Sequence, residues 1–454
     1  MSNPELADNE QDVTVASTPQ LERLGRLLVL ASLAVIGAAT LTPQHGPLET
    51  TPYCIFCGSL GGVDFLLNVL LFVPFGVAMA MRNWRAATAL SAMVALSIGI
   101  ETTQFFFITG RDASIGDVLA NSCGGAIGFV VTRSAGTWRK PSYRAALLLS
   151  AGWAVLWLAL QAAVSYGFTL EFPASRYYGQ IARVFGYMAP FEGTVVSATV
   201  DTIDVPNFGY AKSAQLRAAL QNGKPVATDV VPVNPTPRIA PILRIADAQK
   251  QEIAILAQDR TTFVFGVRVG AQTLRVRSPL YALRNVFPPE AGSQDTLRLA
   301  GTNVGGLVTL SAASSRESVS RQFVVSPATG WALIYPARWY LEDTPWEAVM
   351  GFVWIAVLVV PFGYWGSLFV RGSPLNPRVI FMGAFLLTLF AGLRWIPSRF
   401  GLRPASTSVW LSSVAGLACG ALMAFLALRS DGRDSAEPGR RGKRVASPRQ
   451  VSQV

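Results

Sequence analysis

The sequence predicts an α-helical multi-pass membrane protein of about eight spans, with an inserted extracytoplasmic all-β domain that we expect to be a sandwich. Hydrophobic residues make up 51% of the 454 residues and charged residues only 14%, and the mean hydropathy is +0.37, which is too apolar for a soluble protein of ordinary surface. Apolar segments of membrane length occupy the first third and the last quarter of the chain. The segment between them has none, and its hydrophobic pattern changes to a period of two, which is typical of strands.

The N-terminal part of the chain is expected to cross the membrane five times. Residues 1–22 are polar and predicted to be a disordered tail, and residues 23–168 form the first membrane domain. The expected spans cover residues 27–41, 63–81, 86–108, 114–131 and 145–168. Arg23 and Arg26 precede the first span and no Lys or Arg follows until Arg82, so the positive-inside rule places the N-terminus in the cytoplasm. A signal peptide is the alternative for the first span, but the long acidic segment before it favours an uncleaved helix.

Polar residues are concentrated in and beside the second, third and fourth expected spans. An ionisable group inside a membrane helix costs roughly 2.5 to 3.5 kcal/mol on insertion scales, so such groups usually face a protein interior or a wet cavity. Pairs within a span are spaced three or four apart and share a helix face, and the expected topology places them in the outer leaflet. We therefore predict a polar pocket formed by Asp64, Asn68, Glu101, Gln104, Arg111, Ser114, Asp117 and Asn121. The alternative is that these side chains only cap helices and join them to one another.

The same region carries three motifs: an Asp followed by Asn-x3-Phe-x-Pro-x-Gly, then Glu-x2-Gln-x-Phe, then Arg-x2-Ser-x2-Asp-x3-Asn-x3-Gly. Their residues are Asp64, Asn68, Phe72, Pro74 and Gly76, then Glu101, Gln104 and Phe106, then Arg111, Ser114, Asp117, Asn121 and Gly125. With these motifs, about the first third of the chain resembles the VanZ-like family of bacterial membrane proteins. The resemblance implies a link to low-level resistance to glycopeptide antibiotics such as teicoplanin. It does not imply a particular chemical reaction. Many members carry a histidine at about the position of Asn68, whereas the only histidine here is His45.

Residues 169–343 are predicted to form the extracytoplasmic β-domain. Alternating or β-rich segments lie at residues 194–200, 242–245, 252–256, 261–269, 272–277, 307–311, 323–326 and 331–335. Turn signals at residues 222–223, 258–260 and 328–330 separate them. Many short strands at regular spacing indicate a sandwich or barrel, and the pattern is weakly similar to concanavalin A-like or laminin-G-like sandwiches.

The C-terminal part of the chain is expected to cross the membrane three more times. The predicted membrane domain is residues 344–428, with spans at about 346–370, 379–395 and 406–428, and residues 429–454 form a basic, disordered cytoplasmic tail. Arg394, Arg399 and Arg403 fall on the outer side and depart from the positive-inside rule. The net charge of +11 lies mainly in short loops and this tail, which is how membrane orientation is encoded and argues against nucleic-acid binding.

Cys54 and Cys57 in the first outer loop are expected to form a small disulfide, with free thiols or a metal site as the alternatives. No second cysteine pair or histidine cluster completes a zinc site, so no metal or cofactor is predicted. Cys123 and Cys419 lie in expected spans and are interpreted as packing residues. Two Gly-x3-Gly motifs are interpreted as sites of close helix approach: Gly124 with Gly128, and Gly416 with Gly420. Asp201 and Asp204 form an incomplete calcium pattern.

Three functions are consistent with these features. The first is a non-enzymatic envelope protein that binds a lipid-linked or cell-wall ligand, such as a peptidoglycan precursor or carbohydrate, and lowers glycopeptide sensitivity. The second is an intramembrane enzyme in which Glu101 or Asp117 is the general base and Arg111 holds a phosphate. The third is a transporter, which the lack of an internal repeat disfavours. The sequence leaves the ligand, the redox state of the outer cysteines and the oligomeric state open, and the bilayer is the one partner it implies directly.

Overall fold

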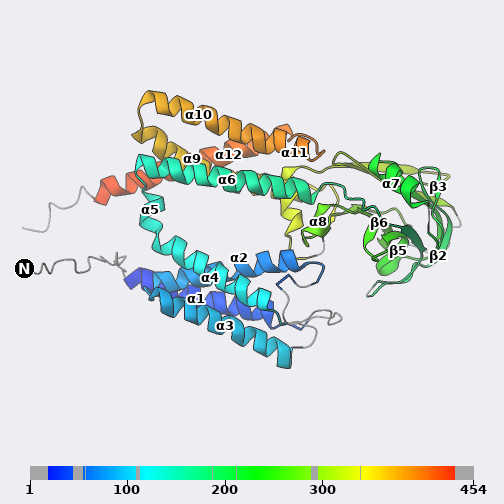
Figure 1. The fold of residues 1–454 in the computed structure, drawn as a ribbon, viewed down its shortest axis with the longest axis horizontal. Coiled ribbons are helices and arrows are strands. Elements are labelled where there is room, and N and C mark those ends of the chain that lie inside the picture. The colour runs from blue at the N-terminus through cyan, green and yellow to red at the C-terminus, as the bar shows by residue number, and fades with distance from the viewer. Residues whose placement is uncertain are drawn as a thin grey trace, which may run out of the picture.

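The computed structural model describes residues 19–43, 55–56, 58–108, 113–186, 188–210, 212–287, 295–337 and 339–434. Figure 1 shows two bundles of long helices lying side by side, with a β-domain at one end of both. The beginning of the first helix and the end of the last helix lie at the opposite end, away from the β-domain.

Eight helices in the described ranges are long and apolar enough to cross a membrane, which confirms the predicted number of helical spans. They are α1 Pro19–Thr40, α2 Gly61–Met81, α3 Ala86–Phe107, α4 Ile115–Arg133, α6 Tyr143–Gly167, α9 Pro345–Gly372, the composite span Leu375–Arg399, and α12 Thr407–Asp434. The composite span consists of α10 Leu375–Phe390, a π-helical turn η2 Ala391–Trp395 and α11 Ile396–Arg399. Most boundaries fall within a few residues of the predicted ones, but α1 begins earlier because its first turns are amphipathic and not purely apolar.

The first bundle consists of α1 to α4 and packs around Phe72, Phe75, Met79 and Met93. The closest approach joins α2 to α4. A Cβ atom on Gly124 or on Gly128 would collide with a backbone carbonyl of α2. The two glycines therefore let the helix backbones touch, as the spacing predicted, and the contact lies within the chain.

The second bundle consists of α6 and α9 to α12. Its core contains Trp157 of α6 and Ile355, Val359 and Phe362 of α9. The short helix α5, Ala135–Arg139, links α4 to α6, so the fifth span leaves its neighbours in sequence and packs on α9 and the composite span. Gly416 and Gly420 of α12 approach the α9 backbone as closely as the first glycine pair approaches α2.

The β-domain contains two six-stranded sheets within the described residues. The order of the first sheet is β1 Tyr177–Ile181, β5 Thr236–Asp247, β6 Glu252–Arg260, β7 Thr262–Val267, β8 Leu280–Leu283 and β12 Tyr340–Leu341. The order of the second is β11 Ser318–Val324, β10 Leu307–Ala313, β9 Leu297–Val304, β4 Val226–Pro232, β2 Gly193–Val200 and β3 Ile203–Asp204. Neighbouring strands are antiparallel except β8 and β12, which are parallel. A helix, α7 Ser213–Gln221, lies between β3 and β4 in sequence.

The sheets face each other across a shared hydrophobic core. The ring of Phe265 in β7 fills the space where Gly301 of β9 has no side chain. Tyr281 of β8 and Phe323 of β11 pack with their ring centroids 5.6 Å apart. Alternate residues of β10 are buried, which is the period of two that identified this strand in the sequence. The two sheets thus pack face to face, as expected for a sandwich.

Two strand predictions are wrong. Residues 331–335 belong mostly to a 3-10 helix, η1 Pro327–Leu333, and residues 272–277 overlap a short helix, α8 Gly270–Thr273. The reason for η1 lies just upstream, where Ser326 forms a capping box with Thr329 and Pro327 occupies the first helical position. The turn predicted at residues 328–330 therefore lies inside η1, and the strand predicted at 323–326 ends at Val324.

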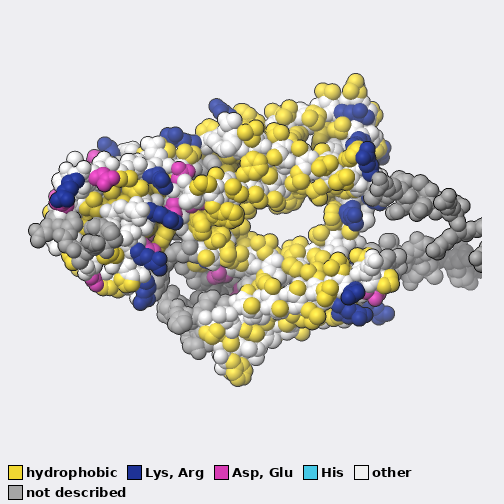
Figure 2. All heavy atoms as spheres, turned by 180° about the vertical axis from the view of Figure 1, so that it is seen from behind, with side chains coloured by type: hydrophobic (Ala, Val, Ile, Leu, Met, Phe, Trp, Pro, Cys, Tyr) yellow, Lys and Arg dark blue, Asp and Glu magenta, His cyan; other side chains and the backbone are white. Residues whose placement is uncertain are grey.

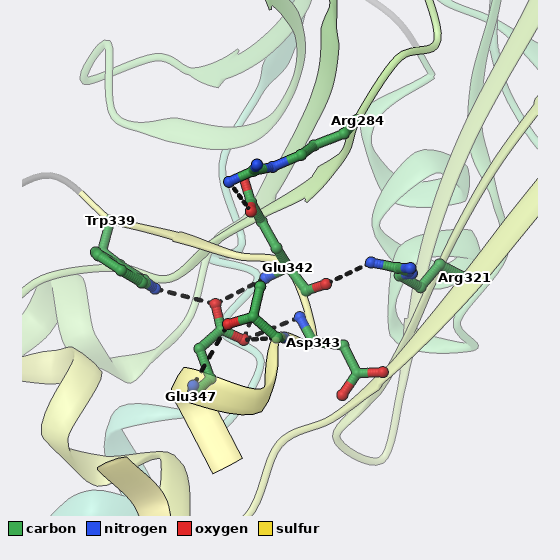
Figure 3. Close-up of polar contacts among 7 residues, drawn as sticks. Arg284, Arg321, Trp339, Glu342, Asp343 and Glu347 are labelled. Atoms are coloured by element: carbon green, nitrogen blue, oxygen red, sulfur yellow. Dashed lines mark hydrogen bonds and ion pairs between the residues drawn. The ribbon is translucent and has the colours of Figure 1, made fainter. Parts of the chain in front are cut away.

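A polar junction fastens the β-domain to the second bundle (Figure 3). Glu347, in the first turn of α9, accepts hydrogen bonds from the indole of Trp339 at 3.0 Å and the backbone amide of Glu342 at 3.0 Å. The Glu342 carboxylate forms an ion pair with Arg284 at 2.5 Å. The backbone carbonyl of Glu342 accepts a hydrogen bond from Arg321 at 2.6 Å. This network fixes the angle at which the chain enters the helix.

Candidate functional site

The centre of the predicted site is a direct contact between α2 and α4. The amide Nδ2 of Asn68 donates to Oδ1 of Asp117 over 2.6 Å. Asn68 lies in the second turn of α2 and Asp117 in the first turn of α4, and both side chains are partly buried. The contact is possible because Gly124 and Gly128, further along α4, remove the side chains that would keep the helices apart.

The start of α4 brings a second carboxylate into the same region. Ser114 is the N-cap of α4, and its hydroxyl accepts a bond from the backbone amide of Asp117 at 2.9 Å. The backbone amide of Ser114 donates to Oε2 of Glu101 on α3 at 2.8 Å. Glu101 is only 8% exposed, and its carboxyl group lies at the positive end of the α4 dipole, where the ionised form of a carboxyl group is stabilised.

Two amide side chains add a further contact with α3 and a contact with α1. Asn121 of α4 donates to the hydroxyl of Ser97 on α3 at 2.9 Å, and its Oδ1 is buried without a partner in the described part of the chain. Gln104 of α3 donates to the carbonyl of Thr40 at the end of α1 at 2.8 Å. We call Asn68, Glu101, Ser114, Asp117 and Asn121 the polar cluster.

Ser97 was not identified from the sequence. It precedes Glu101 by four residues and Gln104 by seven, so helical spacing could have placed it on the same face. A hydroxyl that is fully buried beside Asn121 belongs with the other polar side chains.

Asp64 is exposed at the start of α2 and turns toward the β-domain. The Asp64 carboxylate interacts electrostatically with Arg277, which follows α8. Burial lowers the pKa of Arg277 below its ordinary value, and the nearby Asp64 carboxylate partly opposes that shift. No local pattern in the sequence could have indicated this partner, because the two residues belong to different predicted domains.

Several predicted residues lie outside the described ranges: Arg111, Cys54, Cys57 and His45. Among the residues that are described, no group of His, Cys, Asp and Glu could hold a metal ion. Asp201 instead forms an ion pair with Lys224 at 3.6 Å. Cys123 and Cys419 are exposed on their helices, so their assignment to packing is wrong. Each precedes a close-packed glycine and therefore points away from the helix contact.

A separate cavity of about 540 Å³ lies where the β-domain meets α9 and α12. Apolar side chains such as Phe323, Val349 and Phe352 line most of it, and Asp343 and Ser406 add polar groups. It therefore has the mixed lining that amphiphilic ligands need, at the expected boundary between lipid and water.

Fold and site together define a multi-pass membrane protein whose N-terminal helices are tied by buried polar groups. Comparison with known families agrees, since residues 12–136 match the family described as VanZ/LLP1. The first third of the chain is thus similar to the VanZ/LLP1 family, and α1 to α4 lie within the matched residues. No curated protein and no solved structure gave a match, so the concanavalin-like resemblance of the β-domain has no support beyond its pattern.

Proposed function

We propose that this protein is a non-enzymatic VanZ-like component of the bacterial cell envelope. Its polar cluster binds a lipid-linked or cell-wall ligand, and this binding lowers sensitivity to glycopeptide antibiotics such as teicoplanin. The ligand would meet the cluster from the outer leaflet, with the β-domain outside and both termini in the cytoplasm. The observation that carries the proposal is the meeting of Asn68, Asp117, Ser114 and Glu101 in one chain of hydrogen bonds.

The distribution of positive charge supports this orientation. Figure 2 shows Lys and Arg side chains gathered at the end of the helix bundles away from the β-domain. Arg82 and Arg133 lie at this end, after α2 and within the last turn of α4, and Arg371 lies in the last turn of α9. Since cytoplasmic ends carry the excess of Lys and Arg, the β-domain would lie on the outer side. Arg399, at the other end, stacks on Trp395 at 5.1 Å.

The chemistry of the cluster favours a ligand with hydrogen-bond donors. Asp117 and Glu101 supply carboxylate oxygens, and Asn121 supplies a buried carbonyl oxygen without a partner in the described ranges. Hydroxyl and amide groups, which are abundant in sugars and peptide stems of cell-wall precursors, are therefore the complementary groups. Arg111 is proposed to add the cation for a phosphate.

Binding fits the geometry of Glu101 better than general-base catalysis does. One oxygen of Glu101 accepts the backbone amide of the α4 N-cap, so the carboxylate holds α3 and α4 in register. A group that anchors a helix terminus is poorly placed to move and exchange protons with a substrate. Glu101 is therefore assigned to positioning, and Asp117 with Asn121 to ligand contact.

The test is expression of the full chain in a glycopeptide-sensitive bacterium. The intact protein should raise the inhibitory concentration of teicoplanin, and Asp117→Asn together with Asn121→Ala should abolish the rise. Asp204→Asn, on the exposed β3 strand, is the control and should keep it. Protein abundance in the membrane is measured for each variant. Full resistance from the double variant at normal abundance would disprove the role of the cluster, and no rise from the intact protein would disprove the link to glycopeptides.

A further inference from the structure

An opening passes between the two helix bundles. Figure 2 shows it as a gap in the space-filling surface, with hydrophobic side chains on both sides. The first bundle, α1 to α4, forms one side, and the second, α6 with α9 to α12, forms the other (Figure 1). We call this opening the window.

The wall on the first bundle includes the exposed face of α2. Leu66, Leu70 and Pro74 are exposed and spaced four residues apart, so they form one stripe along the helix. The opposite face carries the buried Phe72 and Phe75 of the bundle core. The stripe is therefore apolar and is not covered by the chain's own helices.

The wall on the second bundle is the face of α6 turned away from α9. Its exposed residues follow helical spacing and are Leu148, Gly152, Val155 and Ala159. The opposite face is buried and consists of Ala146, Ser150, Trp157 and Gln161. A Cβ atom on Gly152 would meet nothing within 4 Å, so this part of the wall adjoins open space.

The chain closes the window at the β-domain end. Leu274 follows α8, and its backbone carbonyl contacts Gly62 at the start of α2. The side chain of Leu274 lies 3.9 Å from the Cβ position of Gly167, the last residue of α6. The carbonyl of Arg275 accepts the backbone amide of Gly62 at 3.0 Å. The segment 268–277 therefore bridges the start of α2 and the end of α6, and we call it the roof.

The helix α5 closes the other end. The carbonyl of Trp138 accepts the indole of Trp365 at 2.9 Å, and the carbonyl of Arg139 accepts the hydroxyl of Tyr364 at 2.6 Å. The window is blocked at one end by the roof and at the other by α5, so a membrane-spanning helix of a partner could not pass through its full length. Flexible hydrocarbon chains, by contrast, can enter from the side. Water would be unfavourable between two apolar walls. Lipid chains are thus the occupant that the geometry favours.

The roof carries an excess of positive charge. Arg268, Arg275 and Arg277 lie in it, and Asp64 and Glu171 are the carboxylates near them. The Nη2 group of Arg277 donates to a carbonyl, and its Nε group is buried without a partner among the described residues.

A cavity of about 110 Å³ adjoins Arg277, with Leu60, Ser278 and Trp339 among its other lining residues. Since a water occupies about 30 Å³ in the liquid, a phosphate-sized group fits this space. A half-buried guanidinium beside a small cavity is suited to a phosphate, whose oxygens pair with its planar fork.

We propose that the window holds the hydrocarbon chains of a phosphate-bearing membrane lipid whose headgroup is bound at the roof by Arg277. This lipid site goes beyond the proposed function, because it uses no residue of the polar cluster. The phosphate could belong to an ordinary anionic phospholipid or to a polyprenyl phosphate, and the two sources share the same chemistry.

The experiment counts lipids that stay bound to the purified full chain by native mass spectrometry. The intact protein should retain phosphatidylglycerol at least threefold more often than phosphatidylcholine. Gly152→Leu fills the window and should lower the number of retained lipids at least threefold. Gly383→Leu is the matched control, because Gly383 also has nothing within 4 Å of its Cβ position and belongs to α10, which lies at the outer edge of the second bundle. It should leave the count unchanged.

A second pair of variants tests the headgroup. Arg277→Gln should lower the preference for phosphatidylglycerol about threefold, while Arg316→Gln, whose side chain is 83% exposed on the β-domain, should not. If Gly152→Leu does not fold, Leu70→Trp fills the window from the other wall. Displacement of phosphatidylglycerol by undecaprenyl phosphate would assign the site to the polyprenyl lipid, and its persistence to the phospholipid. Equal lipid counts in intact, window-filled and control proteins would overturn the proposal, whatever the result for glycopeptide resistance.

Discussion

The hydrogen bond between Asn68 and Asp117 should contribute measurably to the stability of the membrane domain. The bond is 2.6 Å long, joins an amide to a carboxylate and is partly buried. Bonds to charged groups in soluble proteins are worth about 1.5 to 3 kcal/mol, but polar bonds between membrane helices average about 0.6 and reach about 1.7 kcal/mol. The second range applies because an unfolded helix in lipid finds other partners. Since the bond is short and charged, we expect a coupling near the upper end, about 1 to 1.7 kcal/mol.

The measurement is a double-mutant cycle of Asn68→Ala and Asp117→Ala, read from unfolding of the purified chain in detergent with increasing SDS. Both substitutions leave the Ser114 cap in place, because the cap uses the backbone amide of position 117. The control cycle is Asn83→Ala with Arg133→Ala, an exposed pair 3.1 Å apart at the other end of α2 and α4, for which we expect only a few tenths of a kcal/mol. A coupling for Asn68 and Asp117 no larger than that of the control would refute the reasoning.

Three further predictions concern packing, the junction and pH. Gly128→Leu should destabilise the first bundle by about 3 kcal/mol or more, because its side chain would meet the α2 backbone, whereas Gly136→Leu meets open space and should be neutral when SDS unfolding is compared. Glu347→Ala should lower the free energy of unfolding by about 2 kcal/mol or more, because the Trp339 indole and several backbone amides lose their acceptor. The control Glu192→Ala removes an exposed acceptor and should lower it by less than about 0.5 kcal/mol when both variants are compared by thermal unfolding. Burial raises the pKa of Tyr177 to about 12, so its contribution to stability is complete below pH 10 and falls as the pH rises toward 12. Tyr177→Phe should remove that part of the alkaline loss in melting temperature, and an unchanged pH profile would contradict the assignment.

The membrane helices could be predicted from the sequence because their signal is local. Composition over about 20 residues decides whether a segment can span a bilayer, and each predicted span overlaps one of the observed helices. Gly124 and Gly416 were also informative, since a glycine spacing of four has a direct steric meaning. The pairing of α6 with α9 could not be predicted, because any apolar helix surface is compatible with lipid and with many partners. That choice depends on Trp157 and its contacts with Phe362, which are far apart in the chain.

In the β-domain, alternation did not decide which strands the sequence predicted, since β9 alternates between buried and less buried residues and was missed, whereas β6 does not alternate and was predicted at residues 252–256. In β6 six consecutive residues from Ile253 are buried, so a period of two describes only part of it. The segment around Trp331 has the aromatic content of a strand, yet the cap at Ser326 makes it helical. The candidate site was likewise predicted only in part. Spacing grouped Glu101 with Gln104 correctly on one buried face, but the position of Arg277 beside Asp64 depends on how two domains dock.

Direct binding tests the central claim most simply. The full chain, purified in nanodiscs, is titrated with a lipid-linked peptidoglycan precursor and compared with its Asp117→Asn and Asp204→Asn variants. Saturable binding to the intact chain and to Asp204→Asn, weakened at least tenfold in Asp117→Asn, is the predicted result. Equal affinity in all three proteins, or no saturable binding to the intact chain, would contradict the assignment of the polar cluster as the ligand site.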